Sequence, residues 1–400
     1  MSHSVRVTDL RRQNRARVLR SIAMNEVATR GELARELDLS IGTVTNVVTD
    51  LIDEGLVRES SWVPSNGGRP IARLTVVNDA AYFIGADVGE HGVEASLFDL
   101  AMDSVDSVFI SSGLGTTSAE EIRNVVTRAI TDLIARNEEP VRKLRGIGLG
   151  LPGIVESDLD GNTTIFAQSL GWPPIDLAEL TPRLDVPVLA DNGAKTFAAA
   201  ELWAGAAKGA SHCLVVLVGR GVGAGIVTAG RLMRGATSSA GEWGHTKVVV
   251  NGRRCRCGGR GCLEAYVGGA AIRERAVEAG LGVADTDEET LRTLLAAARD
   301  GSAAHRKFLD ETLDILAVGL ANLVNLFNPQ QIVIGGWAGH LLFSGHQPRI
   351  AEGLTSHALA RPAEQISLTE SKCSVDPIAL GAALLPVERY IDDPTLKGRP

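Results

Sequence analysis

The chain lacks the features of membrane-spanning and secreted proteins. It has no uninterrupted apolar run long enough to cross a bilayer, and no charged-then-apolar leader opens it. Only five of its 400 residues are cysteine, too few for a disulfide-based scaffold. We therefore expect a soluble protein of the reducing cytoplasm. The apolar content of 44% permits real cores, and the length favours two or three domains.

The chain also lacks an overall positive charge. Its formal net charge of −8 would normally disfavour nucleic acid as a partner. The distribution of charge reverses that inference, because the first 20 residues carry six arginines against one aspartate. The N-terminal end is therefore a candidate for binding nucleic acid.

Cysteine is scarce but clustered. One imidazole and three thiols fall in a short glycine-rich stretch: His245, Cys255, Cys257 and Cys262. Together they form a tetrahedral zinc ligand set, and Gly258, Gly259 and Gly261 allow the tight folding that it needs. Four ligands leave no open position, which predicts a structural zinc; the alternative is a loop of free thiols. Closing the site would fix Glu242 and Glu264, which lie just outside it, relative to each other.

Apolar residues recur at helical spacing from Arg15 to Leu56 and fit three short helices. Ser40 is placed to cap the third helix, and Gly55 to end it. This is the layout of a helix-turn-helix. The solvent face of the third helix would present short uncharged side chains suited to base edges: Gly42, Thr43, Thr45, Asn46 and Thr49. A generic three-helix bundle, the alternative, would more often fill this face with Lys and Glu.

The segment 56–77 reads as a hairpin with a glycine-rich tip at 64–70, which would be the wing of a winged helix. Arg69 at the tip would contact a minor groove or a phosphate, or else be a solvated linker arginine. Arg11 and Arg12 of the first helix would make similar contacts. We expect Ser40, Thr43, Thr45 and Asn46 to lie at the DNA.

Beyond residue 80, strand-like and helical stretches alternate, which indicates an α/β architecture. Two glycine-turn hairpins, at 84–97 and 214–227, look like one unit used twice. A helix over 316–326 and a strand over 331–336 would complete the second lobe.

The run G-E-x-G-H followed by C-x-C-G-x-x-G-C-x-E resembles the signature of the ROK family, which groups bacterial sugar kinases with sugar-responsive repressors. Matching segments follow in order from Ile84 to Leu385. The resemblance implies a two-lobed actin/hexokinase-like (ribonuclease H-like) domain over 81–400 that binds sugar between its lobes. Residues 1–80 would form the winged helix-turn-helix, and ROK repressors carry a G-R-P element like the one at its tip.

The resemblance leaves open whether the chain is a kinase or a regulator. ROK kinases use an aspartate as general base, and Gly193 stands in its place, which would cost about two to four orders of magnitude in rate. Asp191 lies on a different side of the chain and is a poor substitute. The phosphate-binding turns also differ, with Glu90 in one and Arg220 in the other. These departures disfavour phosphoryl transfer, so we predict no catalytic residues.

Sugar-contacting positions are better preserved. By the resemblance, the sugar ligands would be Asn192, Glu242, His245 and Glu264, with Gly153 allowing close backbone approach. Each taken singly has the alternative of a solvated polar side chain.

Together these features predict a sugar-responsive, zinc-containing repressor of carbohydrate-utilisation genes. We expect a homodimer, or a dimer of dimers, that binds double-stranded DNA at a palindromic operator, with a sugar or sugar phosphate as effector and no membrane partner. One alternative is an active sugar kinase with a DNA-binding appendage. Another is a scaffold whose sugar pocket is vestigial.

Overall fold

The structure, a computed structural model, describes residues 7–25, 28–63, 71–112, 118–158, 161–181, 184–373 and 375–393. The chain divides into two compact units. Unit 1 comprises Met1–Leu151, Ala178–Asp191 and Ile378–Pro400. Unit 2 comprises Pro152–Leu177 and Asn192–Pro377. The chain thus passes several times from one unit to the other.

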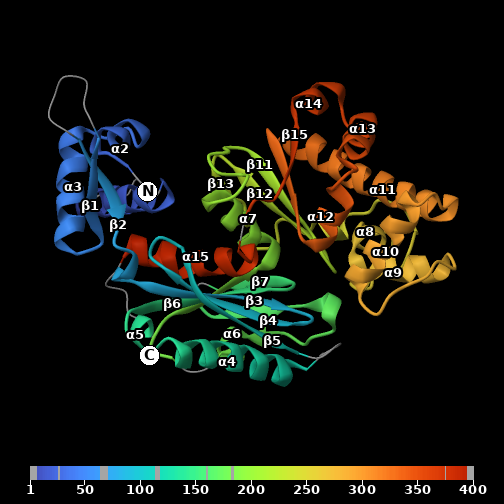
Figure 1. Cartoon of the computed structure of the whole chain (residues 1–400), viewed down its shortest axis with the longest axis horizontal. Coiled ribbons are helices and arrows are strands. Elements are labelled where there is room, and N and C mark those ends of the chain that lie inside the picture. Colours follow the sequence, from blue (N-terminus) through green and yellow to red (C-terminus); the bar gives the residue numbers. More distant parts are fainter. Residues whose placement is uncertain are drawn as a thin grey trace. The chain divides into compact units, whose positions relative to one another are not determined.

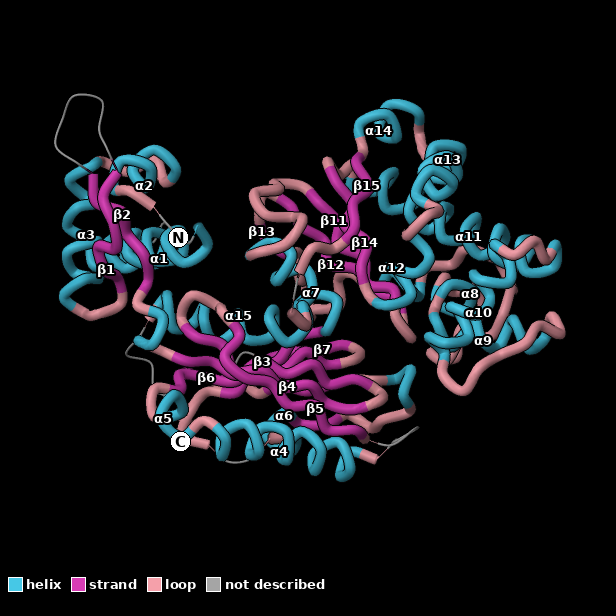
Figure 2. Tube along the Cα trace, in the orientation of Figure 1, coloured by secondary structure: helices cyan, strands magenta, loops and turns pink. Residues whose placement is uncertain are grey.

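The N-terminal part of unit 1 is a winged helix (Figures 1 and 2). Three helices precede an antiparallel hairpin: α1 (Val7–Asn25), α2 (Arg30–Glu36), α3 (Ile41–Asp53), β1 (Val57–Val63) and β2 (Ile71–Val76). This confirms the helices and hairpin that the sequence predicts. However, α1 begins at Val7, well ahead of Arg15, because residues 9–13 of the helix are exposed and show no apolar periodicity.

Local capping defines the ends of these helices. Ser40 caps α3, since its side chain accepts a hydrogen bond from the backbone N–H of Thr43 at 3.1 Å. Thr29 and Glu32 form a capping box at the start of α2. Gly55 follows α3 with a φ of 72°, a conformation that favours glycine. A fully buried core joins the three helices to β2: Val18, Leu19, Ile22, Leu33, Val44, Val48, Leu51 and Leu74.

The rest of unit 1 is built on a five-stranded sheet of order β10-β6-β3-β4-β5. Its strands are β3 (Tyr82–Gly89), β4 (Gly92–Asp99), β5 (Ser104–Ser111), β6 (Leu144–Leu151) and β10 (Val188–Asn192). β3 and β4 form the first predicted hairpin, and β6 runs parallel to β3. Figure 1 shows α4 (Ala119–Arg136) along one face of this sheet and α15 (Pro377–Asp392) along the other.

Glycines let α15 lie unusually close to the sheet. A Cβ atom on Gly85 would lie 1.9 Å from the carbonyl oxygen of Ala379, and one on Gly148 would lie 1.8 Å from that of Ala382. Both distances are far below van der Waals contact, so no larger residue fits at either position without moving the helix.

Unit 2 contains a second five-stranded sheet, of order β13-β12-β11-β14-β15. Its strands are β11 (Cys213–Val218), β12 (Val222–Thr228), β13 (Arg231–Leu232), β14 (Gln331–Gly335) and β15 (Ser367–Glu370). β11 and β12 form the second predicted hairpin, and β14 confirms the predicted strand. The predicted helix at 316–326 is the C-terminal half of a longer helix, α11 (Ala303–Phe327). The first turn of α11 is mostly exposed, so the apolar pattern does not indicate where the helix begins.

The remaining helices of unit 2 are α7 (Gly193–Trp203), α8 (Glu264–Val267), α9 (Gly269–Glu278), α10 (Asp287–Arg299), α12 (Trp337–Phe343), α13 (Gln347–His357) and α14 (Ala360–Gln365). A small sheet of β7 (Ile154–Ser157), β8 (Thr163–Phe166) and β9 (Ile175–Asp176) completes the unit. Two short helices, α5 (Glu138–Val141) and α6 (Leu177–Leu180), lie in connecting segments. Among the helices of the described ranges, none has the length and apolar character needed to cross a bilayer.

Candidate functional site

The exposed face of α3 carries the residues that the sequence assigns to DNA contact. Thr45, Asn46 and Thr49 are exposed and Thr43 is half-buried, while Val44, Val47 and Val48 face the core. This division gives the N-terminal half of α3 a polar outer face without formal charge, suited to a helix that enters the major groove, and the exposed Asp50 and Asp53 follow in its C-terminal half.

Several hydroxyl groups on this face are already engaged. Thr45 Oγ1 donates to the carbonyl oxygen of Ile41 at 2.8 Å, and Ser40 Oγ lies 2.9 Å from Thr43 Oγ1. Thr45 can therefore offer a base edge only its lone pairs and its methyl group. Asn46 carries both a donor and an acceptor at an exposed position. Among these residues, Asn46 is the best placed to read an adenine in a bidentate manner.

The predicted phosphate-contacting arginines divide into three cases. Arg11 is exposed on α1. Arg12 is also exposed, but its Nη1 lies 3.8 Å from a carboxylate oxygen of Asp393, so part of its charge is balanced within the protein. Arg69 lies outside the described residues.

Replacing Asn46 by alanine should weaken operator binding by about 1 to 3 kcal/mol and leave affinity for random duplexes nearly unchanged, because base contacts carry sequence information. Fluorescence anisotropy on both duplexes measures this. Arg11→Ala, the contrasting variant, should weaken both and flatten the dependence of log affinity on log salt by roughly one unit. An Asn46 variant that loses both duplexes equally would contradict its assignment to base reading.

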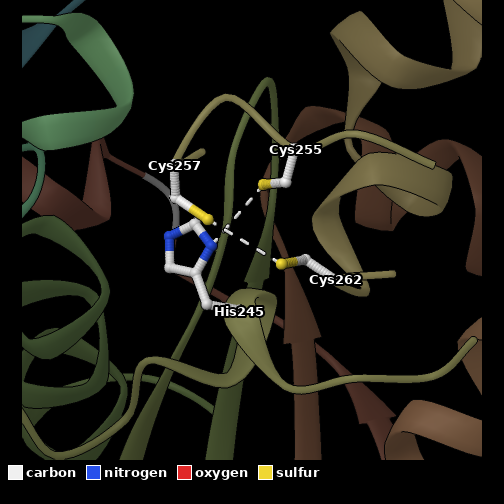
Figure 3. Close-up of side chains that lie close together, drawn as sticks. All are labelled: His245, Cys255, Cys257 and Cys262. Carbon is white, nitrogen blue, oxygen red and sulfur yellow. Dashed lines mark hydrogen bonds between the residues drawn. The ribbon is translucent and has the colours of Figure 1, made fainter. Parts of the chain in front are cut away.

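In unit 2, the predicted metal ligands converge on one point (Figure 3). His245 ends a short 3-10 helix, Trp243–His245, and the three cysteines come from the glycine-rich loop that follows it. Their ligand atoms all lie within 4.8 Å of one another. The structure thus brings together all four residues that the sequence groups, and this cluster can hold a metal ion.

The distances within the cluster fit zinc. Cys257 Sγ and Cys262 Sγ are 3.8 Å apart, and Cys255 Sγ is 3.8 Å from His245 Nδ1. Thiolates at about 2.3 Å from a tetrahedral zinc would be separated by roughly 3.8 Å, whereas sulfurs in a disulfide are about 2 Å apart. The donor set and these two distances are therefore compatible with a bound metal ion.

The surroundings of the cysteine thiols shift their pKa values in different directions. Burial raises the pKa of Cys255 to about 12. The pKa of Cys257 lies below its ordinary value: burial acts to raise it, but the N–H of Gly259 and the neighbouring thiols outweigh that effect. Lys247 Nζ lies 2.7 Å from Cys262 Sγ, and this contact raises the pKa of Lys247. Lys247 was not among the predicted site residues, and its position two residues after His245 is its only signal in the sequence.

Backbone geometry holds the cysteine loop in this shape. The N–H of Val248 donates to the carbonyl oxygen of Gly261, and the N–H of Cys255 donates to that of Gly259, each at 2.9 Å. Gly258 and Gly261 have φ values of 88° and 73°, and a Cβ on Gly261 would lie 1.7 Å from the carbonyl oxygen of Val249. These glycines are therefore required by the turn.

Two carboxylates lie beside the cluster. Glu264 is buried at the start of α8; its Oε2 accepts from the N–H of Val222 at 3.1 Å, and its Oε1 lies 3.8 Å from Cys255 Sγ. Burial raises the pKa of Glu242, and Glu264 raises it further, while the charges of His245 and Lys195 lower it. Glu242, His245 and Glu264 therefore lie within electrostatic range of each other.

The other two predicted sugar ligands contact each other directly. Asn192 caps α7, and its Nδ2 donates to the carbonyl oxygen of Gly153 at 2.7 Å. Gly153 has a φ of 81°, and a Cβ there would lie 2.4 Å from the carbonyl oxygen of Phe166. Both residues are half-buried. Lys195 lies in the first turn of α7, which Asn192 caps. The positive charge of Lys195 acts to lower the pKa of Glu242.

Two further contributors were missed by sequence reasoning. Lys195 is 1% exposed and donates to the carbonyl oxygen of Ser238, so a buried cation lies beside the candidate sugar ligands. Gln168 Nε2 donates to the carbonyl oxygen of Cys257 at 3.0 Å and ties the small sheet's segment to the cysteine loop. Neither has a sequence signal, because both contacts join segments far apart in the chain.

The positions that distinguish kinases are placed as follows. Gly193 is the first residue of α7 and has no side chain to act as a base. Asp191 lies in the strand before it and is 2% exposed. Glu90 lies in the β3–β4 turn, and Arg220, in the β11–β12 turn, lies 3.7 Å from Asp287.

Comparison with known proteins identifies the family. The ROK family model matches residues 83–389, and the MarR family model matches residues 12–61. The xylose repressor of Caldicellulosiruptor bescii is 31% identical over 344 residues, covering 83% of this chain and 84% of that repressor. NagC, a DNA-binding transcriptional dual regulator of Escherichia coli K12, is 30% identical over 329 residues, covering 81% of this chain and 80% of NagC.

Solved structures give the same fold. A ROK family transcriptional regulator, a homolog of the E. coli Mlc protein, aligns with a TM-score of 0.77 at 24% identity over 96% of this chain and 97% of that one. The ROK hexokinase of Thermus thermophilus aligns with a TM-score of 0.60 at 26% identity, covering 76% of this chain and 97% of the hexokinase. The chain belongs to the ROK family, and with its MarR-type winged helix it is a sugar-responsive DNA-binding transcriptional regulator of the repressor type.

Proposed function

We propose that this regulator acts on a palindromic operator as a homodimer, or as a dimer of dimers, and that it lacks kinase activity. The observation that carries the proposal is the combination of an exposed, uncharged N-terminal half of α3 with a ROK domain that has Gly193 where kinases have their base. The division of labour would place DNA binding in residues 1–80 and effector binding in 81–400. Its compartment would be the cytoplasm, where bacterial operators lie.

The bound metal would be structural zinc, held by His245, Cys255, Cys257 and Cys262. Four protein ligands fill a tetrahedral shell, so the metal would supply folding free energy rather than an activated water. The loop that it closes carries Glu264 at its end, so zinc would also set the position of a sugar-binding carboxylate.

The effector would be a sugar or sugar phosphate bound by Asn192, Glu242, His245 and Glu264, with Gly153 admitting it close to the backbone. Carboxylates accept hydrogen bonds from vicinal hydroxyls, and the charge of the buried Lys195 acts to lower the pKa of Glu242, against the effect of burial. The names of the relatives make xylose and N-acetylglucosamine the first compounds to test. An effector shifts operator affinity only if it binds the conformation that binds DNA and the conformation that does not with different affinities.

Glu242→Gln should shift the sugar response to higher sugar concentrations and leave basal operator binding nearly intact. A hydrogen bond to a charged group is worth about 1.5 to 3 kcal/mol, so sugar affinity should fall by roughly ten- to a hundredfold. Thermal shift against a panel of sugars and sugar phosphates, followed by titration, measures this. Glu352→Gln, which removes an exposed carboxylate on α13, is the matched control. If the Glu242 variant gave the same sugar titration as the wild type, the assignment of Glu242 as a sugar ligand would be wrong.

An active kinase with a DNA-binding appendage is the second candidate, favoured by the fold shared with the hexokinase. We expect no ATP-dependent sugar phosphorylation at the roughly 1 to 100 per second typical of kinases, because Gly193 provides no base. A coupled ADP-release assay over hexoses and pentoses checks this. Turnover in that range would show that the protein is a kinase as well as a regulator.

A further inference from the structure

Arg20 of α1 binds the C-terminal turn of α15. Its Nε lies 2.9 Å from each carboxylate oxygen of Glu388, its Nη2 also donates to Glu388, and Nη2 lies 3.6 Å from Asp392. A guanidinium that contacts both oxygens of one carboxylate fixes its direction as well as its distance. Arg20 therefore orients the winged helix on α15.

Two more arginines of α1 reinforce this contact. Arg15 Nη1 donates to the carbonyl oxygen of Ile391 at 3.2 Å, and its Nε donates to Glu54 at 3.4 Å. Arg12 approaches Asp393. The last carbonyls of a helix lack internal partners and carry partial negative charge, so arginines stabilise this end of α15. Three of the six arginines in the basic N-terminal stretch thus contact the last turn of α15 or Asp393, the residue that follows it.

The body of α15 packs closely on the sheet of unit 1. Close packing against Gly85 and Gly148 leaves no room for the helix to slide, and the ring of Tyr390 packs edge-on against Phe83 with centroids 5.7 Å apart. A 16-residue helix spans about 24 Å, so α15 connects its first turn, near the start of the sheet contact, to the last turn that Arg20 binds.

The first residue of α15 is also where the chain leaves unit 2. Unit 2 ends at Pro377, and unit 1 resumes at Ile378. A second crossing falls between Asp191 and Asn192, a candidate sugar ligand. A displacement of unit 2 would therefore reach α15 directly through the backbone.

We propose that Arg20, Glu388 and Asp392 are positioning residues that fix the winged helix on α15, and that sugar binding reaches the DNA-binding face through this contact. The inference rests on the proposed sugar response. Ion pairs this exposed contribute little to stability, so their loss should change coupling rather than folding.

Hydrogen–deuterium exchange of the full chain without sugar tests the contact itself. Arg20→Gln should speed exchange at 387–392, and Glu388→Gln should speed it at 15–22, each by about two- to fivefold as expected for losing an exposed ion pair. Arg17→Gln is the matched control, because Arg17 lies on the same helix but donates to the carbonyl oxygen of Leu37 within the winged helix. If Arg20→Gln left exchange at 387–392 unchanged, the contact would be refuted.

Operator titrations test the coupling. A duplex selected in vitro by the wild-type protein is titrated with and without millimolar D-xylose or N-acetylglucosamine. The ratio of the two Kd values, about 5 to 150 for typical allosteric coupling, should fall to about one in Arg20→Gln and Glu388→Gln and persist in Arg17→Gln. A ratio retained in both variants would overturn the proposal. A wild-type ratio of about one for every sugar would instead refute the sugar response, while the exchange experiment still decides the contact.

Discussion

Replacing Cys257 by serine is expected to reduce bound zinc from about one per chain to none and to destabilise the ROK domain. Structural zinc contributes roughly 10 to 16 kcal/mol of apparent binding free energy in small zinc-dependent folds, and that energy is folding energy. Even a fraction of it, about 3 kcal/mol, would lower the melting temperature by roughly 6 to 12 °C in a domain of this size. Metal analysis and differential scanning calorimetry measure the two effects.

Cys373→Ser is the matched control for this variant. Cys373 lies outside the cluster, and burial together with the nearby Glu201 carboxylate raises its pKa, so it remains a neutral thiol. We expect it to keep full zinc content. Wild-type protein without zinc, when prepared without chelators, would show that the four residues form a loop of free thiols instead.

Gly148→Ala should be the most disruptive single methyl group in unit 1. The added Cβ would lie 1.8 Å from the carbonyl oxygen of Ala382 and 2.4 Å from its carbonyl carbon, and neither backbone atom can rotate away. Overpacking of this kind costs about 1 to 3 kcal/mol, and more where the backbone is the obstacle. Because α15 must lift from the sheet, sugar-dependent operator binding should weaken together with stability. Urea unfolding and operator titration measure both.

Gly31→Ala controls for the loss of glycine itself. Gly31 lies inside α2, and no atom lies within 4 Å of the position that an added methyl group would take. Alanine there should therefore stabilise the helix by roughly 0.5 to 1 kcal/mol. Equal stability of the Gly148 variant and the wild type would show that α15 is not packed tightly on β6.

The features that sequence predicts well are those encoded locally. Ser40 and the recurrence of valines at helical spacing define α3 within one short segment, and the zinc ligands lie within eighteen positions of each other. The capping box of Thr29 and Glu32 is encoded just as locally, by the pattern T-x-x-E before an apolar position.

Tertiary contacts have no comparable signal. Arg20 reads as one of many N-terminal arginines, and only the fold reveals that a carboxylate 368 residues away engages it. Lys195 reads as a helix surface residue, yet packing buries it beside Glu242. In the sequence, Gly85 and Gly148 look like ordinary strand breakers. The structure shows that they make room for α15, a helix from the other end of the chain.

The most decisive experiment is the affinity of the full-length protein for its in vitro selected duplex, measured by anisotropy with and without each sugar of the panel, together with a footprint of that duplex. We expect a protected palindrome with half-sites about 10 or 21 base pairs apart and a Kd that changes with at least one sugar. A single unpaired half-site, or sugar-independent affinity in protein that phosphorylates sugars at kinase rates, would contradict the assignment of this chain as a dimeric, sugar-responsive regulator.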